Sequence, residues 1–316
     1  MSTRPTPSTS DGTYALISSA YTSHISQQSP STSRTNDLVA RSFGYTALSL
    51  STLPGTSNLG VSCGNPLALA HLQPGETIVD LGSGGGLDVF LASPFVGATG
   101  RAIGVDMTPA MVTLARRNAE KGGYGNVEFV LARVTAVPLD SGCADVVVSN
   151  CVINLVPQEE KKKVFEECWR LLKSGGRLAV SDLLARGELP EMVRSDAALL
   201  VGCVAGASRV DEYEAWLRGV GFKDVVFVDT KSDLNVYKEG ILSQDAVDVA
   251  DAGAACCAAK PKPKPKPELK ENGCCGADVR DTAETQGATG SAYRERLEKL
   301  DLNEYVGAYQ IYAIKP

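Results

Sequence analysis

The stretch that decides the fold runs from Glu76 to Leu87 and reads E-T-I-V-D-L-G-S-G-G-G-L. Its apolar, partly β-branched beginning is typical of a strand buried on both faces. Glycines then alternate with small residues before a second apolar run that can open a helix. A strand, a glycine turn and a helix start bring free backbone N–H groups and the positive end of a helix dipole to one place. We therefore expect a ligand to lie directly against this backbone, where no Cβ is in the way.

The glycine spacing narrows the class of ligand. A dinucleotide-binding turn reads G-x-G-x-x-G, but the sixth residue is Leu87 counted from Gly82 and Val89 counted from Gly84. The Lys-Ser/Thr pair of a P-loop is missing as well. The remaining pattern, acidic-x-G-x-G-x-G, resembles motif I of the Rossmann-like methyltransferases that use S-adenosylmethionine (SAM). The resemblance implies that Asp80 seats the amino-acid end of that cofactor. The alternative is a glycine-rich turn without a ligand.

Composition restricts the partners and the compartment. The 316 residues carry a formal net charge of -6, which favours neither nucleic acid nor an anionic membrane surface. The longest apolar stretch, residues 197–207, is too short to span a bilayer. Nine cysteines occur without a recognisable secretory leader. We therefore expect a cytoplasmic protein with reduced thiols, and a monomer by default.

Strands and helices alternate after Glu76, which predicts an α/β fold with a parallel sheet and helices on both of its faces. The predicted strands are Thr77–Leu81, Arg101–Asp106, Val127–Leu131, Ala144–Asn150, Arg177–Leu183 and Phe222–Val228. The predicted helices are Leu87–Val96, Met107–Gly122, Glu159–Leu172, Glu191–Val201 and Asp211–Val220. Thr108 is suited to cap the second of these helices, with Pro109 in its first turn.

We divide the chain into four parts. Residues 1–36 form a flexible Ser/Thr-rich segment, within which Tyr14–Ile25 has the spacing of a short docking helix. Residues 37–244 form the SAM-binding domain. Residues 245–290, with four Lys-Pro pairs, form a disordered insertion. Residues 291–316 form a helix and a strand that returns to the sheet. Methyltransferases of this class place a seventh, antiparallel strand beside the sixth, so we expect a class I methyltransferase fold with a seven-stranded, mostly parallel sheet.

The predicted cofactor residues lie at the carboxyl ends of the strands, where ligands bind to such sheets. Asp106 closes the second strand and can accept the two ribose hydroxyls; the alternative is an anion that only stabilises a helix N-terminus. Met107 can pack on adenine, and the loop after the third strand supplies further adenine contacts. The full predicted set is Asp80, Gly82, Ser83, Gly84, Gly86, Asp106, Met107, Val134, Thr135 and Asn150.

The cysteines fall into different environments. Cys168 lies on the apolar stripe of a helix and suits a core position, and Cys143 lies in a turn. Cys63, Cys151 and Cys203 lie in three separate segments. Spacing alone does not show that these three meet, and the paired ligands of a zinc site are missing.

Five stretches in order resemble the arsenite methyltransferases. They are N-L-G-V-S-C-G-N-P (58–66), D-L-G-S-G-G-G-L-D (80–88), I-G-V-D-M-T (103–108), S-N-C-V-I-N-L (149–155) and G-C-V-A-G-A (202–207). The resemblance implies that Cys63, Cys151 and Cys203 bind trivalent arsenic, which accepts methyl groups from SAM in a detoxification reaction. It also implies arsenite or its thiol conjugates as substrates, and a thiol reductant of the thioredoxin or glutathione system. Soft thiolates suit a soft centre such as arsenic.

One departure from that family leaves two alternatives open. Many members carry a cysteine upstream of the first arsenic ligand, whereas here none precedes Cys63. The pairs Cys256-Cys257 and Cys274-Cys275 either pass arsenic to the enzyme and reduce it, or are solvated thiols. Two rival functions also remain. One is a SAM-dependent methyltransferase of a small organic acceptor with structural cysteines, and the other is a non-catalytic arsenite-binding protein.

Overall fold

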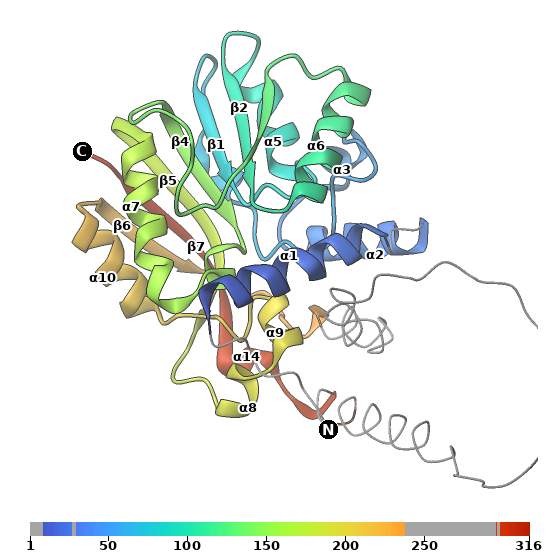
Figure 1. Ribbon diagram of the computed structural model, residues 1–316, viewed down its shortest axis with the longest axis vertical. Coiled ribbons are helices and arrows are strands. Elements are labelled where there is room, and N and C mark those ends of the chain that lie inside the picture. Colours follow the sequence, from blue (N-terminus) through green and yellow to red (C-terminus); the bar gives the residue numbers. More distant parts are fainter. Residues whose placement is uncertain (1–8, 27–29, 238–294, 296–297) are drawn as a thin grey trace, which may run out of the picture.

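The computed structural model describes residues 9–26, 30–237, 295 and 298–316 (Figure 1). Its centre is a seven-stranded sheet in the order β3-β2-β1-β4-β5-β7-β6. The strands are β1 (Thr77–Leu81), β2 (Arg101–Asp106), β3 (Val127–Leu131), β4 (Ala144–Asn150), β5 (Leu172–Ala185), β6 (Lys223–Asp229) and β7 (Val306–Ile314). Strands β1 to β5 pair in parallel, and β7 is antiparallel to both of its neighbours. The predicted fold class is confirmed.

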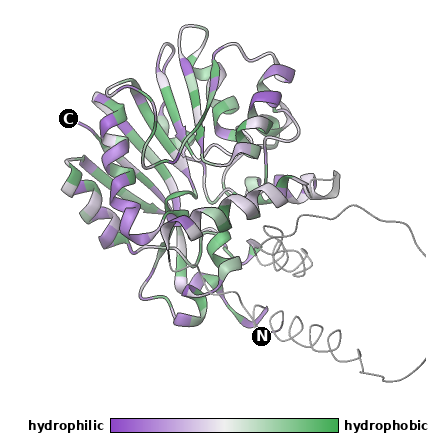
Figure 2. Cartoon of the chain, in the orientation of Figure 1, coloured by the Kyte–Doolittle hydropathy of each residue, from purple (hydrophilic) through white to green (hydrophobic). Residues whose placement is uncertain are grey.

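Helices cover both faces because strand residues alternate between them. Helices α5 (Leu87–Val96) and α6 (Pro109–Gly122) pack on one face, against Ile78, Ala102 and Val146. Helices α7 (Lys161–Leu171) and α10 (Val210–Val220) pack on the other, against Val79, Ile103 and Val147. Figure 2 shows the hydrophobic strands enclosed by helices whose hydrophilic sides face outward.

The last strand returns to the sheet from far along the chain. β7 inserts between β5 and β6, and its register pairs Val306 with Ala185 at one end and Ile314 with Arg177 at the other. The short helix α14 (Leu302–Tyr305) leads into it. The predicted insertion 245–290, its four cysteines and most of the helix expected over residues 291–300 lie outside the described residues.

The N-terminal segment is more ordered than its Ser/Thr-rich composition predicts. Ser10–Ser26 forms helix α1, and Pro30–Ser42 forms helix α2. Tyr14 and Ile17 of α1 are buried against the domain. Burial of these side chains offsets the low helix preference of Ser and Thr. Helix α1 confirms the docking helix predicted over Tyr14–Ile25.

In the described part of the chain, six further short helical elements lie in the connections between the longer elements. They are α3 (Ala47–Ser51), α4 (Leu67–Ala70), α8 (Glu191–Arg194), α9 (Ala197–Val201) and two 3-10 turns, Ile153–Leu155 and Gln158–Glu160. The single helix expected over Glu191–Val201 is divided in two, because the Asp196 side chain caps the second part by accepting from the N–H groups of Ala198 and Leu199. Among the described residues, no helix is both long and apolar enough to cross a membrane.

Candidate functional site

The glycine turn after β1 is held open by its contacts with β2. Asp106 Oδ2 accepts from the Gly84 N–H at 3.0 Å, and its Oδ1 accepts from the Thr108 N–H at 2.8 Å. Gly82 has a φ of 78°, and a Cβ at this position would lie 2.3 Å from the Val152 side chain. Only glycine permits this approach, so the turn presents bare backbone to the space above the sheet.

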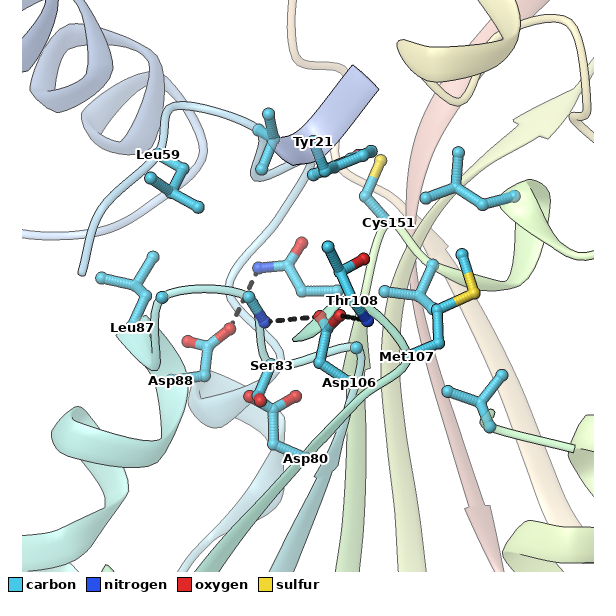
Figure 3. A pocket seen from close by; sticks show the side chains of 18 of the residues that line it. Tyr21, Leu59, Asp80, Ser83, Leu87, Asp88, Asp106, Met107, Thr108 and Cys151 are labelled. Carbon is cyan, nitrogen blue, oxygen red and sulfur yellow. Dashed lines mark hydrogen bonds between the residues drawn. The ribbon is translucent and has the colours of Figure 1, made fainter. Parts of the chain in front are cut away.

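A pocket opens above this turn and extends to Cys151 (Figure 3). The carboxylates of Asp80, Asp88 and Asp106 line it, and none of the described lining residues is Lys, Arg or His. The hydroxyl of Ser83 is buried in the same wall and has no hydrogen-bond partner among the described residues. Such a pocket fits a ligand that carries positive charge and polar groups, as SAM does with its sulfonium and ammonium. It does not fit the phosphates of a dinucleotide.

Burial disfavours the ionised form of the pocket carboxyl groups and raises their pKa values. It raises the pKa of Asp88 to about 6, against which hydrogen bonds from Tyr45 and Asn150 act. Burial also raises the pKa of Asp80, and the nearby charges of Asp88 and Asp106 raise it further. A cationic ligand would relieve this repulsion, because an opposite charge favours the ionised carboxylates.

The structure places most of the predicted cofactor residues on this pocket. Those that line it are Asp80, Gly82, Ser83, Gly84, Asp106, Met107, Val134 and Asn150. Gly86 is not among the lining residues: it precedes α5 with a φ of 97°, and a Cβ there would meet Phe90 and Phe129. Thr135 is not among them either. Gly86 and Thr135 therefore lie outside the lining of the pocket.

Sequence reasoning missed Asp88 and the residues of α1. Asp88 lies in the first turn of α5, where an acidic residue is an ordinary helix-dipole feature, so nothing in the sequence signals that it is 4% exposed. Tyr14, Ile17 and Tyr21 of α1 line the same pocket. Tyr14 donates to Glu160 at 2.8 Å, and the Arg133 guanidinium stacks 4.3 Å from its ring centre. Helix α1 therefore covers the space between the glycine turn and the cysteines.

Three cysteines from distant segments meet beside the pocket. Cys63 comes from the loop before α4, Cys151 directly follows β4, and Cys203 follows α9. Cys63 Sγ and Cys151 Sγ lie within 4.8 Å of each other, and Cys203 Sγ donates to the Cys151 carbonyl oxygen at 2.7 Å. Cys203 is held beside Cys151 but lies outside the tighter group of Cys63, Cys151 and Asp182. Cys143 and Cys168 are elsewhere, the latter in the core beneath α7.

The three cysteines are buried, and two of them have a left-handed backbone conformation. Cys63, Cys151 and Cys203 are 0%, 4% and 2% exposed. Burial raises the pKa of Cys63 to about 12 and that of Cys151 well above the usual range. For Cys203 the hydrogen bond with Cys151, followed by burial, raises the pKa. Cys151 and Cys203 also have φ values of 60° and 64°, a left-handed conformation that costs a non-glycine residue about 1–3 kcal/mol and often marks functional sites.

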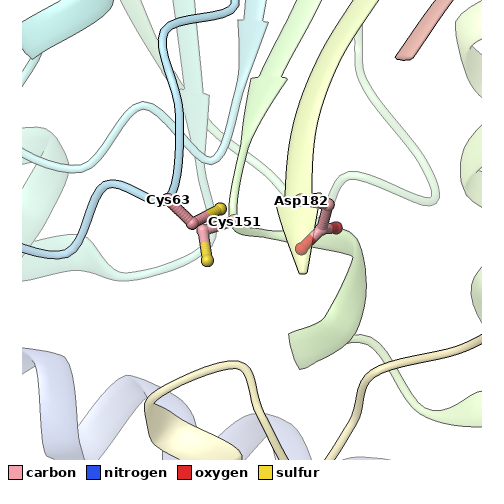
Figure 4. A group of neighbouring side chains, drawn as sticks. All are labelled: Cys63, Cys151 and Asp182. Carbon is pink, nitrogen blue, oxygen red and sulfur yellow. The ribbon is translucent and has the colours of Figure 1, made fainter. Parts of the chain in front are cut away.

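A buried carboxylate completes this side of the site. The sulfur atoms of Cys63 and Cys151 and a carboxylate oxygen of Asp182 all lie within 4.8 Å of one another, at the carboxyl ends of β4 and β5 (Figure 4). Asp182 accepts from Tyr213 Oη and from Asn154 Nδ2, both at 2.8 Å. Burial raises the pKa of this carboxyl to about 6. These contacts fix the carboxylate in place, and the donor set suits a thiophilic centre.

The sheet order and the glycine turn are those of the class I methyltransferase fold. Residues 72–227 match the family model described as a methyltransferase domain.

Within that class, the chain is similar to the arsenite methyltransferases. It is 47% identical over 182 residues to the arsenite methyltransferase of Halobacterium salinarum, covering 58% of this chain and 46% of that protein. It is 38% identical over 154 residues to the human arsenite methyltransferase, covering 46% of this chain and 40% of that protein. The chain thus spans about half the length of the curated relatives it matches.

A solved structure gives the same relationship. The crystal structure of the arsenic(III) S-adenosylmethionine methyltransferase of Chlamydomonas reinhardtii superposes with a TM-score of 0.52 at 25% identity. The match covers 88% of this chain and 73% of that one.

Proposed function

We propose that this protein transfers methyl groups from SAM to trivalent arsenic held by Cys63, Cys151 and Cys203. The observation that carries the proposal is the pairing of Cys63 with Cys151, and the contact of Cys203 with the Cys151 carbonyl, beside a pocket lined by three carboxylates and no described basic group. Three sulfur ligands suit the pyramidal geometry of trivalent arsenic, and soft ligands select soft centres. A role in arsenic detoxification follows from this activity.

The acidic pocket would hold the cofactor in one orientation. Asp106, which already orders the glycine turn, would accept the ribose hydroxyls, and Asp80 with Asp88 would face the cationic amino-acid end. Cys151 lines the same pocket, so the methyl would be presented on the arsenic side. The SAM sulfonium supplies the electrophilic methyl group.

Catalysis would rest on positioning rather than on a general base. The arsenic lone pair forms the As–C bond, while the electron pair of the breaking methyl–sulfur bond stays on the cofactor sulfur. The buried cysteines hold arsenic in near-attack geometry and exclude water. The two-electron oxidation of arsenic is reversed by an external thiol reductant, either the dithiol of a thioredoxin or two molecules of glutathione, which is oxidised to the disulfide.

The test is direct. The full chain is incubated with arsenite, a dithiol reductant and SAM labelled in its methyl group, and methylated arsenic is measured by chromatography with elemental mass spectrometry. Labelled methylarsenicals are the expected product. Methylation of an organic acceptor such as a quinone precursor, without methylated arsenic under reducing conditions, would overturn the proposal. Binding of arsenite without SAM binding or turnover would instead favour a non-catalytic arsenite-binding protein.

A further inference from the structure

Asn150 lies between the acidic pocket and the cysteine cluster and contacts both. It ends β4, next to Cys151. Its Oδ1 accepts from the Cys63 N–H at 3.2 Å and lies 3.7 Å from Cys63 Sγ. Its Nδ2 donates to the Gly64 carbonyl at 2.9 Å and to Asp88 Oδ2 at 3.2 Å. The Asn150 side-chain amide is therefore hydrogen-bonded both to the loop that carries Cys63 and to the Asp88 carboxylate of the pocket.

The orientation of this amide is set by its partners. The Cys63 N–H can only donate, whereas the Gly64 carbonyl and an ionised Asp88 can only accept, so one assignment of oxygen and nitrogen satisfies all three. Tyr45 reinforces it, since its hydroxyl donates to Asp88 Oδ1 at 2.7 Å and lies 2.8 Å from Asn150 Nδ2 as an acceptor. The two Nδ2 hydrogens serve three acceptors, the Gly64 carbonyl, Asp88 and Tyr45, so two of these acceptors share one hydrogen. Asp88, Tyr45 and Asn150 thus form a closed ring of hydrogen bonds, here called the amide bridge.

The loop at the other end of the bridge has little room to move independently. A Cβ on Gly64 would lie 2.5 Å from the Ser181 side chain, and Cys63 Sγ is 3.5 Å from the Ser181 carbonyl oxygen. The loop is thus pressed against β5, and Asn150 is its hydrogen-bonded connection to the pocket. A change in the strength of the amide bridge changes how firmly Cys63 is held, because the Cys63 N–H and the Gly64 carbonyl are both hydrogen-bonded to the Asn150 amide.

We propose that Asn150 is a positioning residue through which occupancy of the acidic pocket fixes Cys63, so that SAM and arsenite bind cooperatively. The proposal rests on the function proposed above. A cation seated against Asp88 holds its carboxylate ionised and oriented, and hydrogen bonds to a charged acceptor are shorter and stronger than neutral ones. Both bonds from the bridge to Asp88 then tighten and hold Asn150 in the rotamer that binds the Cys63 loop. Coupling of this kind between two ligands is reciprocal.

The test measures the coupling rather than turnover. Arsenite affinity of the full chain is measured by equilibrium dialysis, with and without saturating S-adenosylhomocysteine, which carries the ammonium but cannot react. We expect the wild type to bind arsenite about 5- to 100-fold more tightly with S-adenosylhomocysteine, the usual range for two coupled sites. Asn150→Ala and Tyr45→Phe should each bring this ratio close to one. Tyr45→Phe is the milder change, because it leaves the bonds from Asn150 to the Cys63 loop in place, and it decides the question if Asn150→Ala does not fold.

Tyr237 provides a matched control, because it is hydrogen-bonded to the loop that carries Cys63 but does not belong to the amide bridge. The Tyr237 hydroxyl donates to the Ser62 carbonyl at 2.6 Å and, like Tyr45, belongs to an aromatic residue beside this loop. Tyr237→Phe should keep the wild-type ratio even if it weakens arsenite binding. An unchanged arsenite affinity on adding S-adenosylhomocysteine, or a wild-type ratio in both bridge variants, would overturn the coupling while leaving the proposed function intact. A wild type that binds no arsenite at all would overturn the proposed function and the coupling with it.

Discussion

Cys203 and Cys151 are joined by a contact of 2.7 Å from the Cys203 sulfur to the Cys151 carbonyl oxygen. Both residues have left-handed backbones, one after β4 and the other after α9. This contact pins the loop of Cys203 to the end of the sheet. Cys203 is thus held next to Cys151, whose sulfur lies within 4.8 Å of the Cys63 sulfur, and the surrounding packing holds the strained backbones in place.

Serine substitutions separate the three clustered cysteines from the others. Cys63→Ser, Cys151→Ser and Cys203→Ser should each lower methylarsenic formation by about 100-fold or more, beyond the effect usual for groups that only support a ligand. The reason is that a hydroxyl is a hard ligand and binds arsenic poorly. Product is measured by elemental mass spectrometry, with half-buried Cys143→Ser as the control, expected to match the wild type. Full activity in Cys203→Ser would contradict the three-thiol site.

Removal of the Asp106 charge should weaken the cofactor site. Asp106→Asn loses a charged acceptor and turns one amide hydrogen toward a backbone donor, either Gly84 or Thr108. We expect the Kd for S-adenosylhomocysteine to rise about 10- to 100-fold, the value of a hydrogen bond to a charged group. Calorimetric titration measures it. Exposed Asp140→Asn removes the same charge away from the pocket and should change nothing; equal affinities in the two variants would argue against the ribose role.

The buried thiols should resist alkylation until the solution is strongly alkaline. Burial raises the pKa of Cys63 from 9.0 to about 12, so near neutral pH it holds about 1000-fold less thiolate than an unperturbed thiol. Iodoacetamide labelling followed by peptide mass spectrometry over pH 7 to 10 reports this directly. Cys143, which is less buried, should react first, and equal rates for Cys63 and Cys143 would show that the cluster is open to solvent.

An ion pair away from the site gives a pH-dependent contribution to stability. Arg177 makes two 2.8 Å bonds to the Glu76 carboxylate. Burial alone raises the pKa of Glu76, but the bonds from Arg177 and from the Gln73 N–H outweigh it, and the net pKa is lowered. A lowered pKa means that stability is present above the unfolded value of 4.5 and is lost as the pH falls through the folded value.

Glu76→Gln should therefore destabilise the protein by about 1–2 kcal/mol at pH 7, the range for a hydrogen-bonded charge at a partly exposed site. The difference from the wild type should shrink as the pH falls below 4.5 and vanish below the lowered pKa of the folded state, where the wild-type carboxylate is protonated as well. Urea unfolding at several pH values measures both. Methyl transfer should be unaffected, and a difference that persists in acid would assign the effect to packing instead.

The fold followed from local patterns. Alternating apolar runs, the glycine turn, and Thr108 and Pro109 at the start of α6 each constrain neighbouring residues, and the strands appear where these patterns predict them. The less accurate predictions concern weak local signals that tertiary contacts override. The cap at Asp196 divides the helix predicted over Glu191–Val201. Helix α1 forms where the spacing of Tyr14–Ile25 predicted it but extends further into Ser- and Thr-rich sequence, because Tyr14 and Ile17 are buried.

The amino-acid sequence by itself determined the sheet, the glycine turn and the carboxylate at Asp106, because these depend on the periodicity and spacing of neighbouring residues. Only the tertiary structure decided that Cys63, Cys151 and Cys203 meet, and that Asp88 and Asn150 connect them to the pocket. Those residues are separated by tens of positions, and their distances are set by how loops pack at the carboxyl edge of the sheet. No local preference encodes such a distance; it arises when the strands align and their ends come together.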